Sequence, residues 1–457
     1  MKKTFIQEEK KDLRNIFRRL LKRDFSGNMG LFMKNSAYQF GTTFFAKIGS
    51  LIFTIILARL LMPELFGLYS LALSTLILFI GLTDLGLESG MVFFLSKVLS
   101  KKNKSKAKSY LIYLSKAKLW VLLVVISILL LLSRTISVSY YQKPIFAALI
   151  IGALYVFFRS IVSFSKAIFY SLNNFKQPFI WEISFQILRL IIVPLVIILF
   201  LDTIKNDPSK ISIIIFALAL SWFLVFGMII RSFFTSIDFL KISHKKLQKR
   251  DKQGIKKMIM PLSAITLSGI FFGYIDMFVL GRFVLAEYIG YYQVAFSLVG
   301  SIAALITFST VLLPIFSRMK GKQLENAAKR AIKGTSILAS LVLIATFIFA
   351  PLLVKIVFGA DYSNAIPLLR ILSLLILVLP LNVIYNSKLI SQGKPAIIAK
   401  LLILTTIVNI SLNYFVAISL ISQGPMAIVY GICFTTIFSK YLYLAALSIA
   451  SRKKKSK

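Results

Sequence analysis

The chain has 457 residues, of which 58% are apolar, and its mean hydropathy is +0.83. This composition excludes an ordinary soluble protein. The net charge is +39, but the basic residues lie between long apolar runs. That pattern indicates membrane topology and attraction to anionic lipid, and it argues against nucleic-acid binding. The single cysteine, Cys433, excludes a disulfide framework.

The first 34 residues are charged and lack the apolar core of a cleavable signal peptide. Their apolar side chains recur at helical spacing among several arginines and lysines; they are Leu13, Ile16, Phe17, Leu20 and Leu21. This is typical of an amphipathic helix that lies on the cytoplasmic leaflet. A frayed basic tail fits the same residues.

Twelve apolar runs follow, and each is long enough to cross roughly 30 Å of hydrocarbon as a helix. Their expected spans are 36–61, 65–87, 110–133, 145–171, 179–201, 211–233, 258–281, 289–315, 334–358, 364–387, 396–420 and 425–450. The prolines fall mostly between these runs or at their starts, as helix geometry favours.

The distribution of basic residues predicts the orientation of these helices. With both termini inside, the inner loops and ends hold 39 of the 55 lysines and arginines, and the outer loops hold 5. Such an excess on one side supports twelve crossings with cytoplasmic termini. We therefore expect a multi-pass protein of the cell (plasma or inner) membrane.

A basic loop divides the chain into two halves. It covers residues 234–257, and its only histidine, His244, is expected to be solvated. The predicted organisation has five segments. They are a basic amphipathic segment (1–34), a six-helix bundle (35–233), a cytoplasmic linker (234–257), a second six-helix bundle (258–450) and a basic tail (451–457).

Residues 57–74 recur, shifted by 223 positions, as residues 280–297. Seven of the 18 aligned residues are identical, including Arg59/Arg282 and Gly67/Gly290. Because the expected topology places both copies at the outer face, the halves are predicted to be parallel repeats. The repeated turn is expected to be scaffold.

Eleven basic residues fall within or at the edges of the apolar runs. Charges at bilayer depth are costly and usually face a cavity or a partner. Lys47, Arg159 and Arg189 are the deepest, and they are the first candidates for substrate binding. The further candidates are Lys166, Arg370 and Lys400. The remainder are expected to extend to the interface; they are Arg59, Lys116, Lys118, Lys355 and Lys440.

Three acids lie at comparable depth, namely Asp84, Glu182 and Asp276. They are too few to neutralise the cations, so a cationic cavity with an anionic cargo is predicted. Structural pairing of the cations with backbone carbonyls is the alternative. Asp84 and Asp276 are also the expected sites of any coupling to protons or sodium.

Two asparagine pairs, Asn382/Asn386 and Asn409/Asn413, each share a helix face because their members are four residues apart. They could line a polar cavity and bind sugar hydroxyls, or they could hydrogen-bond between helices. The sequence has no phosphate-binding P-loop, no metal-ligand cluster and no acyl-transfer triad. No cofactor or metal is expected, and the protein is not expected to be an enzyme.

The segment ARLLMPELFGLYSLALSTLILFIGLTDLGL resembles the opening of the Wzx-type polysaccharide biosynthesis flippases, a branch of the multidrug/oligosaccharidyl-lipid/polysaccharide (MOP) exporter superfamily. LLPIFSRM, FGADYSNAIPLLRIL and VNISLNYFVAISLISQGPMAIVYG resemble that family's second half. The resemblance implies an all-α integral membrane protein with twelve transmembrane helices in two parallel-repeat six-helix bundles, MATE-like and V-shaped, around a central cationic cavity.

The resemblance further implies transport of a polyprenyl-diphosphate-linked oligosaccharide from the inner to the outer leaflet, with cavity cations holding the diphosphate. The expected partners are this lipid-linked oligosaccharide, membrane lipids and glycan-assembly proteins, and the protein is expected to be monomeric. A cation-coupled multidrug or metabolite antiporter of the same fold is the nearest alternative. A membrane-embedded glycan polymerase is less favoured, because no large outer loop is present.

Overall fold

The computed structural model describes residues 27–237, 242–243, 247–307, 316, 319 and 321–452. The expected amphipathic helix before residue 27, the end of the basic tail, and part of the basic linker including His244 lie outside this range. Within it the chain is helical and contains no strand. The division into five segments remains a prediction.

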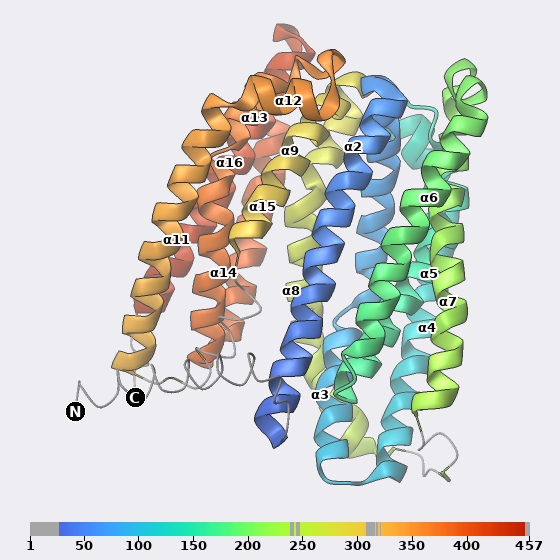
Figure 1. The fold of residues 1–457 in the computed structure, drawn as a ribbon, viewed down its shortest axis with the longest axis vertical. Coiled ribbons are helices and arrows are strands. Elements are labelled where there is room, and N and C mark those ends of the chain that lie inside the picture. Colours follow the sequence, from blue (N-terminus) through green and yellow to red (C-terminus); the bar gives the residue numbers. More distant parts are fainter. Residues whose placement is uncertain are drawn as a thin grey trace.

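The first half begins with one long helix, α2 (Gly27–Asp84), which is broken at Met62 (φ 59°, ψ 171°). Pro63 follows, and the residue before a proline is pushed out of helical geometry. The chain reverses there, so α2 holds two crossings (Figure 1). The remaining elements are α3 (Leu87–Ser100), α4 (Lys104–Arg134), η1 (Thr135–Tyr141), α5 (Phe146–Ser171), α6 (Lys176–Asn206), η2 (Pro208–Ile211) and α7 (Ser212–Ser236).

The second half repeats this pattern with more interruptions. Its ninth and tenth crossings are each split, at Phe349 and at Ser373–Leu374. The elements are α8 (Lys249–Phe283), α9 (Ala286–Ile306), α11 (Lys322–Ile348), α12 (Ala350–Phe358), η4 (Ala360–Tyr362), α13 (Ala365–Leu372), α14 (Leu375–Ser391), α15 (Pro395–Ser419), η5 (Ile421–Gln423) and α16 (Pro425–Arg452).

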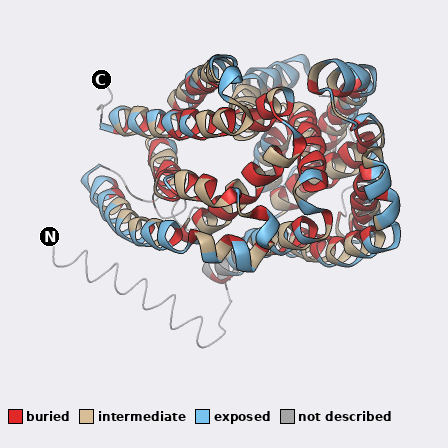
Figure 2. Ribbon diagram, turned by 90° about the horizontal axis from the view of Figure 1, so that it is seen from above, coloured by how far each residue is buried: buried red, intermediate tan, exposed pale blue. Residues whose placement is uncertain are grey.

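Among the described residues, 11 helical stretches are long and apolar enough to cross a membrane. The first, Lys34–Ser100, has 67 residues and contains two of the expected crossings, because α2 reverses at Met62. The twelve-helix prediction is therefore confirmed. The outward surfaces of the helices carry exposed apolar side chains such as Trp120, Leu131 and Phe234, whereas the inner surfaces are buried (Figure 2).

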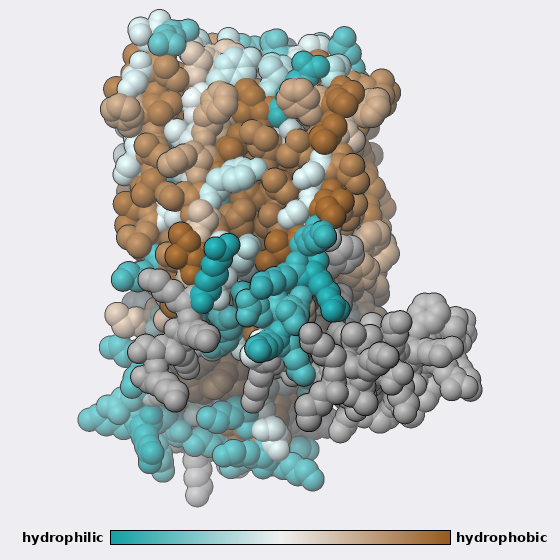
Figure 3. Space-filling view, turned by 90° about the vertical axis from the view of Figure 1, so that its left-hand side faces the viewer, coloured by the Kyte–Doolittle hydropathy of each residue, from teal (hydrophilic) through white to brown (hydrophobic). Residues whose placement is uncertain are grey.

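One broad face shows how this surface suits a bilayer. Beside α11, apolar residues cover most of the height, and hydrophilic residues gather at the lower end (Figure 3). We call this end, where α2 begins and α16 ends, the terminal end (Figure 1). We call the opposite end, where α2 reverses at Met62 and α8 passes into α9, the hairpin end.

At the hairpin end the two repeated segments pack against each other. A Cβ on Gly67 would lie 1.8 Å from the carbonyl oxygen of Ala286, and a Cβ on Gly290 would lie 2.2 Å from that of Pro63. Pro63 and Ala286 are equivalent in the 223-residue repeat, as are the two glycines. The contact is thus reciprocal, and only glycine permits this backbone approach.

The two arginines of the repeat form hydrogen bonds between the halves at the same end. Arg59 donates from Nε to the carbonyl of Val357 at 2.9 Å and also contacts the carbonyl of Ile356. Arg282, its equivalent, donates to the carbonyls of Ser139 (3.1 Å) and Tyr140 (2.7 Å). Each arginine therefore reaches across to a short helix of the other half, α12 for Arg59 and η1 for Arg282. Arg59 does not merely extend to the interface.

A lysine and a tyrosine complete these cross-contacts. Lys143 donates to the carbonyl of Gly281 at 2.6 Å, and Tyr362 donates to the carbonyl of Ala58 at 2.9 Å. Burial, with Arg282 adding to it, lowers the pKa of Lys143 to about 8. Together the glycines, the arginines and these two residues join the two halves at the hairpin end, which is therefore closed in this structure.

Candidate substrate cavity

Directly beneath the closed hairpin end is a cavity of about 690 Å³. Most of its wall comes from α2, α5, α6, α8 and α9, so both halves contribute. Ser70, near the closure, is buried, whereas Lys47, farther toward the terminal end on the other arm of α2, is exposed. The cavity is therefore most accessible from the terminal end. Its volume is typical of small-molecule sites.

The first half supplies four cations to this wall: Lys47 from α2, Arg159 and Lys166 from α5, and Arg189 from α6. Arg159 and Lys166 are seven residues apart, which places them on one face of α5, two turns from each other. All four were candidates from the sequence.

Within the part of the chain that the structure describes, one of these cations has a carboxylate partner. Lys166 forms an ion pair with Glu182 at 2.6 Å, and the Gln186 amide donates to the other Glu182 oxygen at 2.5 Å. Arg159 hydrogen-bonds the hydroxyl of Tyr155. Among the described residues, no carboxylate pairs with Lys47, Arg159 or Arg189.

Arg189 is the most exceptional of these side chains. It is 9% exposed, and its Nε and Nη2 find no hydrogen-bond partner among the described residues. The guanidinium lies against two rings instead, 4.7 Å from the centre of Phe53 and 5.1 Å from that of Phe185. Leaving a buried donor unsatisfied costs about 1–3 kcal/mol, and more when it is charged. An anion in the cavity would relieve this cost.

The second half contributes one acid and one further cation. Asp276 is 4% exposed and accepts hydrogen bonds from Tyr292 and Asn413, both at 2.7 Å. Lys440 donates to the carbonyl of Phe272 at 2.6 Å and lies 3.4 Å from the centre of its ring. The wall thus carries five cations and two carboxylates, Glu182 and Asp276, so positive charge is in excess.

Comparison with known proteins identifies the family. The sequence profile of the polysaccharide biosynthesis protein family matches residues 32–320, which is more than half of the chain. The chain belongs to this family. None of the curated protein sequences matches it.

The fold of this family member is that of MOP transporters. A structure described as the inward-facing conformation of a multidrug resistance MATE family transporter of the MOP superfamily gives a TM-score of 0.70 at 15% identity, covering 92% of this chain and 100% of that one. The lipid II flippase MurJ, in an inward closed conformation, gives 0.67 at 17% identity, covering 91% and 87%. A MATE protein in the straight conformation gives 0.54 at 15% identity, covering 92% and 96%.

Several candidates from the sequence lie outside the cavity of this family member. Arg370 on α13 donates to the carbonyl of Phe347 at 3.4 Å and packs on its ring, and Lys400 is exposed on α15. Asp84 caps α3, accepting the backbone N–H of Glu88 at 2.9 Å. The sequence gives the depth of these charges but not the direction in which they point.

The four asparagines are not among the residues that line the cavity. Asn413 bonds Asp276, Asn409 donates to Ser439 at 3.3 Å, and Asn386 accepts from Tyr443 at 3.1 Å. Asn382 is buried within α14, and its Oδ1 finds no partner among the described residues. The three bonded amides hydrogen-bond between helices, as the alternative interpretation held.

Two lysines expected at the interface are in fact buried. Lys440 lines the cavity, and Lys118 is 2% exposed. Lys118 donates to the Thr83 carbonyl at 2.9 Å and to its hydroxyl at 3.2 Å, and it lies 3.8 Å from Glu88. Because α4 begins at Lys104, Lys118 is near the middle of the helix.

Lys118→Met should lower the free energy of unfolding by about 1–3 kcal/mol, because buried oxygens lose their donor. Thermal unfolding in detergent measures the change. Lys116→Met is the matched control, since Lys116 lies two residues away on the same helix and is exposed. Equal, small effects of both substitutions would show that Lys118 has no special role in stability.

Proposed function

We propose that this protein is a secondary transporter that moves a polyprenyl-diphosphate-linked oligosaccharide from the cytoplasmic to the outer leaflet of the cell membrane for surface polysaccharide synthesis. The observation that carries the proposal is Arg189, a buried guanidinium on the cavity wall for which the described residues supply neither an acceptor for Nε and Nη2 nor a carboxylate. A diphosphate supplies several acceptor oxygens and negative charges to such a group. Membership of the polysaccharide biosynthesis family supports a glycan as the rest of the cargo.

The orientation predicted from basic residues supports the same direction of transport. With the terminal end in the cytoplasm, the cavity is accessible from the leaflet where lipid-linked glycans are assembled, and the closed hairpin end faces outward. The membrane potential then favours outward movement of an anion by about 2.3 kcal/mol per charge per 100 mV. No ATP-binding motif is needed for this.

Coupling to protons or sodium is assigned to Asp276. Its carboxylate lies on the cavity wall beside Tyr292 and Asn413. Protonation of this carboxylate, or binding of sodium to it, would therefore change the electrostatic potential at the substrate. Asp84 is unsuited to this role, since it caps α3 away from the cavity.

A multidrug antiporter is the second candidate, because the fold is shared with MATE transporters. Excess positive charge on the cavity wall disfavours cationic drugs as cargo. A glycan polymerase has less support, since the connections between helices on the hairpin side are short.

Deletion of the gene tests the proposal. Cells without the protein should lose a surface glycan and accumulate the lipid-linked oligosaccharide in the inner leaflet, and re-expression should reverse both changes. Extraction of the lipid-linked fraction and staining of the surface glycan measure these outcomes. Normal surface glycan together with altered resistance to dyes or cations would favour the antiporter.

A further inference from the structure

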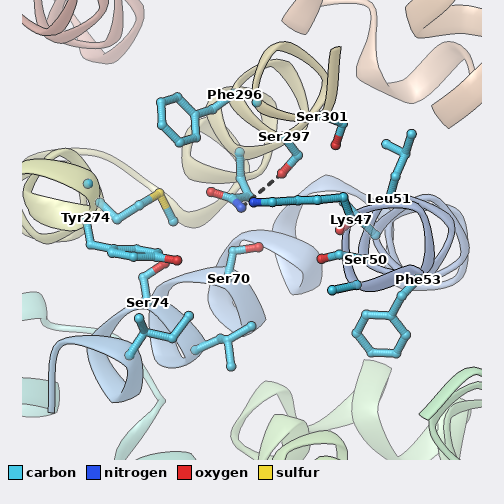
Figure 4. A pocket seen from close by; sticks show the side chains of 18 of the residues that line it. Lys47, Ser50, Leu51, Phe53, Ser70, Ser74, Tyr274, Phe296, Ser297 and Ser301 are labelled. Atoms are coloured by element: carbon cyan, nitrogen blue, oxygen red, sulfur yellow. Dashed lines mark hydrogen bonds between the residues drawn. The ribbon is translucent and has the colours of Figure 1, made fainter. Parts of the chain in front are cut away.

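The cavity wall also carries a strip of uncharged polar side chains that the cationic site does not explain. Gln293, Ser297 and Ser301 follow one another at four-residue spacing on α9, and Ser70 and Ser74 do the same on α2. We call these five residues the hydroxyl strip. Figure 4 shows the four serines pointing into the cavity, together with the hydrogen bond from Gln293 to Ser297 at 3.1 Å.

Four of the strip's five residues lie at equivalent positions of the two halves. In the 223-residue repeat Ser70 corresponds to Gln293, and Ser74 corresponds to Ser297. Because α2 and α9 pack side by side, the strip crosses the boundary between the halves. The first-half cations are on α5, α6 and the other arm of α2, so the strip and these cations come from different helical segments of one wall.

The serines of the strip differ from most hydroxyls in these helices. In an apolar helix a hydroxyl usually bonds a carbonyl one turn back, as Thr75 does to Leu71 at 2.9 Å. Among the described residues, Ser70, Ser74 and Ser301 have no hydrogen-bond partner. These hydroxyls are left for a ligand in the cavity.

The same cavity contains buried polar atoms without partners that independently indicate a ligand. Besides Arg189, the Oε1 of Gln186 is unsatisfied, and Gln186 is 7% exposed. Both side chains line the cavity with the strip. The cavity therefore offers both cationic and uncharged polar groups to a ligand.

The chemistry of the strip selects the neutral groups. A sugar hydroxyl both donates and accepts, and serine and glutamine do the same, whereas lysine and arginine only donate. The rings of Tyr274 and Phe296 lie beside the strip (Figure 4) and offer apolar faces to the C–H side of a pyranose. Such a mixed surface suits a carbohydrate better than a lipid chain or an inorganic anion.

We infer that the hydroxyl strip binds the first sugars of the glycan, while Arg189 and its neighbouring cations bind the diphosphate. This inference rests on the proposed function and adds an orientation to it: the phosphates lie against α5 and α6, and the sugars lie against α9 and the second arm of α2. Discrimination between glycans then resides in the strip, and affinity for the carrier resides in the cations.

The test compares two probes with purified full-length protein in detergent. One probe is farnesyl diphosphate, which has no sugar, and the other is the lipid-linked oligosaccharide extracted from the deletion cells. The double variant Gln293→Met, Ser297→Ala should weaken oligosaccharide binding about tenfold, the loss expected for one or two hydrogen bonds, and change farnesyl diphosphate binding less than twofold. Ser165→Ala is the control, because that hydroxyl bonds its own helix at the Ile161 carbonyl.

Other outcomes separate failure of the inference from failure of the proposed function. If the double variant weakens both probes equally, or weakens neither, the strip does not bind sugar. Arg189→Met should weaken both probes. If it weakens neither, or if the wild-type protein binds neither probe, the proposed function itself is overturned, and the inference falls with it.

Discussion

Arg189→Met should reduce surface glycan to the level of the deletion strain. The substitution keeps an unbranched apolar stem in the site but removes the guanidinium that lies against Phe53 and Phe185, and with it the buried charge that an anion would pair with. A charge-assisted hydrogen bond contributes about 1.5–3 kcal/mol, so substrate affinity should fall about 10- to 100-fold. Complementation of the deletion strain and the amount of accumulated lipid-linked oligosaccharide measure the effect.

Arg370→Met is the matched control for this experiment. Arg370 was also a candidate from the sequence, but its guanidinium lies against Phe347 away from the cavity. It should complement the deletion nearly as well as the wild type. If both variants are equally active, or equally inactive at equal membrane abundance, Arg189 has no special role in binding.

Gly67→Val should block transport by a different route. Any Cβ at this position meets the backbone oxygen of Ala286, so the hairpin end cannot close as it does here. The variant should insert normally but fail to return to the state that loads substrate. Complementation should be lost, and the cavity should become accessible from outside the cell.

Labelling measures that accessibility. Ser70→Cys places a thiol near the closed end, and Cys433→Ser removes the chain's single native cysteine. A membrane-impermeant maleimide added to intact cells should label Gly67→Val severalfold more than its parent. Gly227→Val is the control, because nothing lies within 4 Å of a Cβ there. Unchanged labelling with full complementation would show that the glycine contact is not a gate.

The sequence predicts much of this fold because membrane helices carry strong signals. The lengths of the apolar runs predict twelve membrane crossings, and Pro63 marks the point where α2 reverses. The repeat predicted parallel halves. It did not predict that Gly67 and Gly290 meet the opposite copy, since contact between two helices depends on packing that the repeat alone does not encode.

The sequence predicts how deep the candidate site residues lie in the membrane, but not whether each side chain faces the cavity. Lys47, Arg159, Lys166 and Arg189 line the cavity. Helices this apolar carry little information about which face is inward, so Lys400 could not be told apart from them.

Helix boundaries were a second source of error. An apolar run that begins at 110 predicts that Lys118 lies near a helix end, whereas α4 begins at Lys104. Lys440 lies well inside its apolar run, and its depth alone would have made it a candidate for substrate binding, as it did Arg189. The hydroxyl strip was missed because isolated serines in membrane helices usually satisfy themselves.

Reconstitution provides the most direct test of transport by the cationic cavity. Purified protein in liposomes, supplied with lipid-linked oligosaccharide extracted from the deletion cells, is assayed by the fraction of glycan that becomes accessible on the opposite leaflet. Wild-type protein should speed this transfer well above empty liposomes, and Arg189→Met should reduce it about 10- to 100-fold, while Arg370→Met should not. Transfer no faster than in empty liposomes, or equal transfer by wild type and Arg189→Met, would contradict the account.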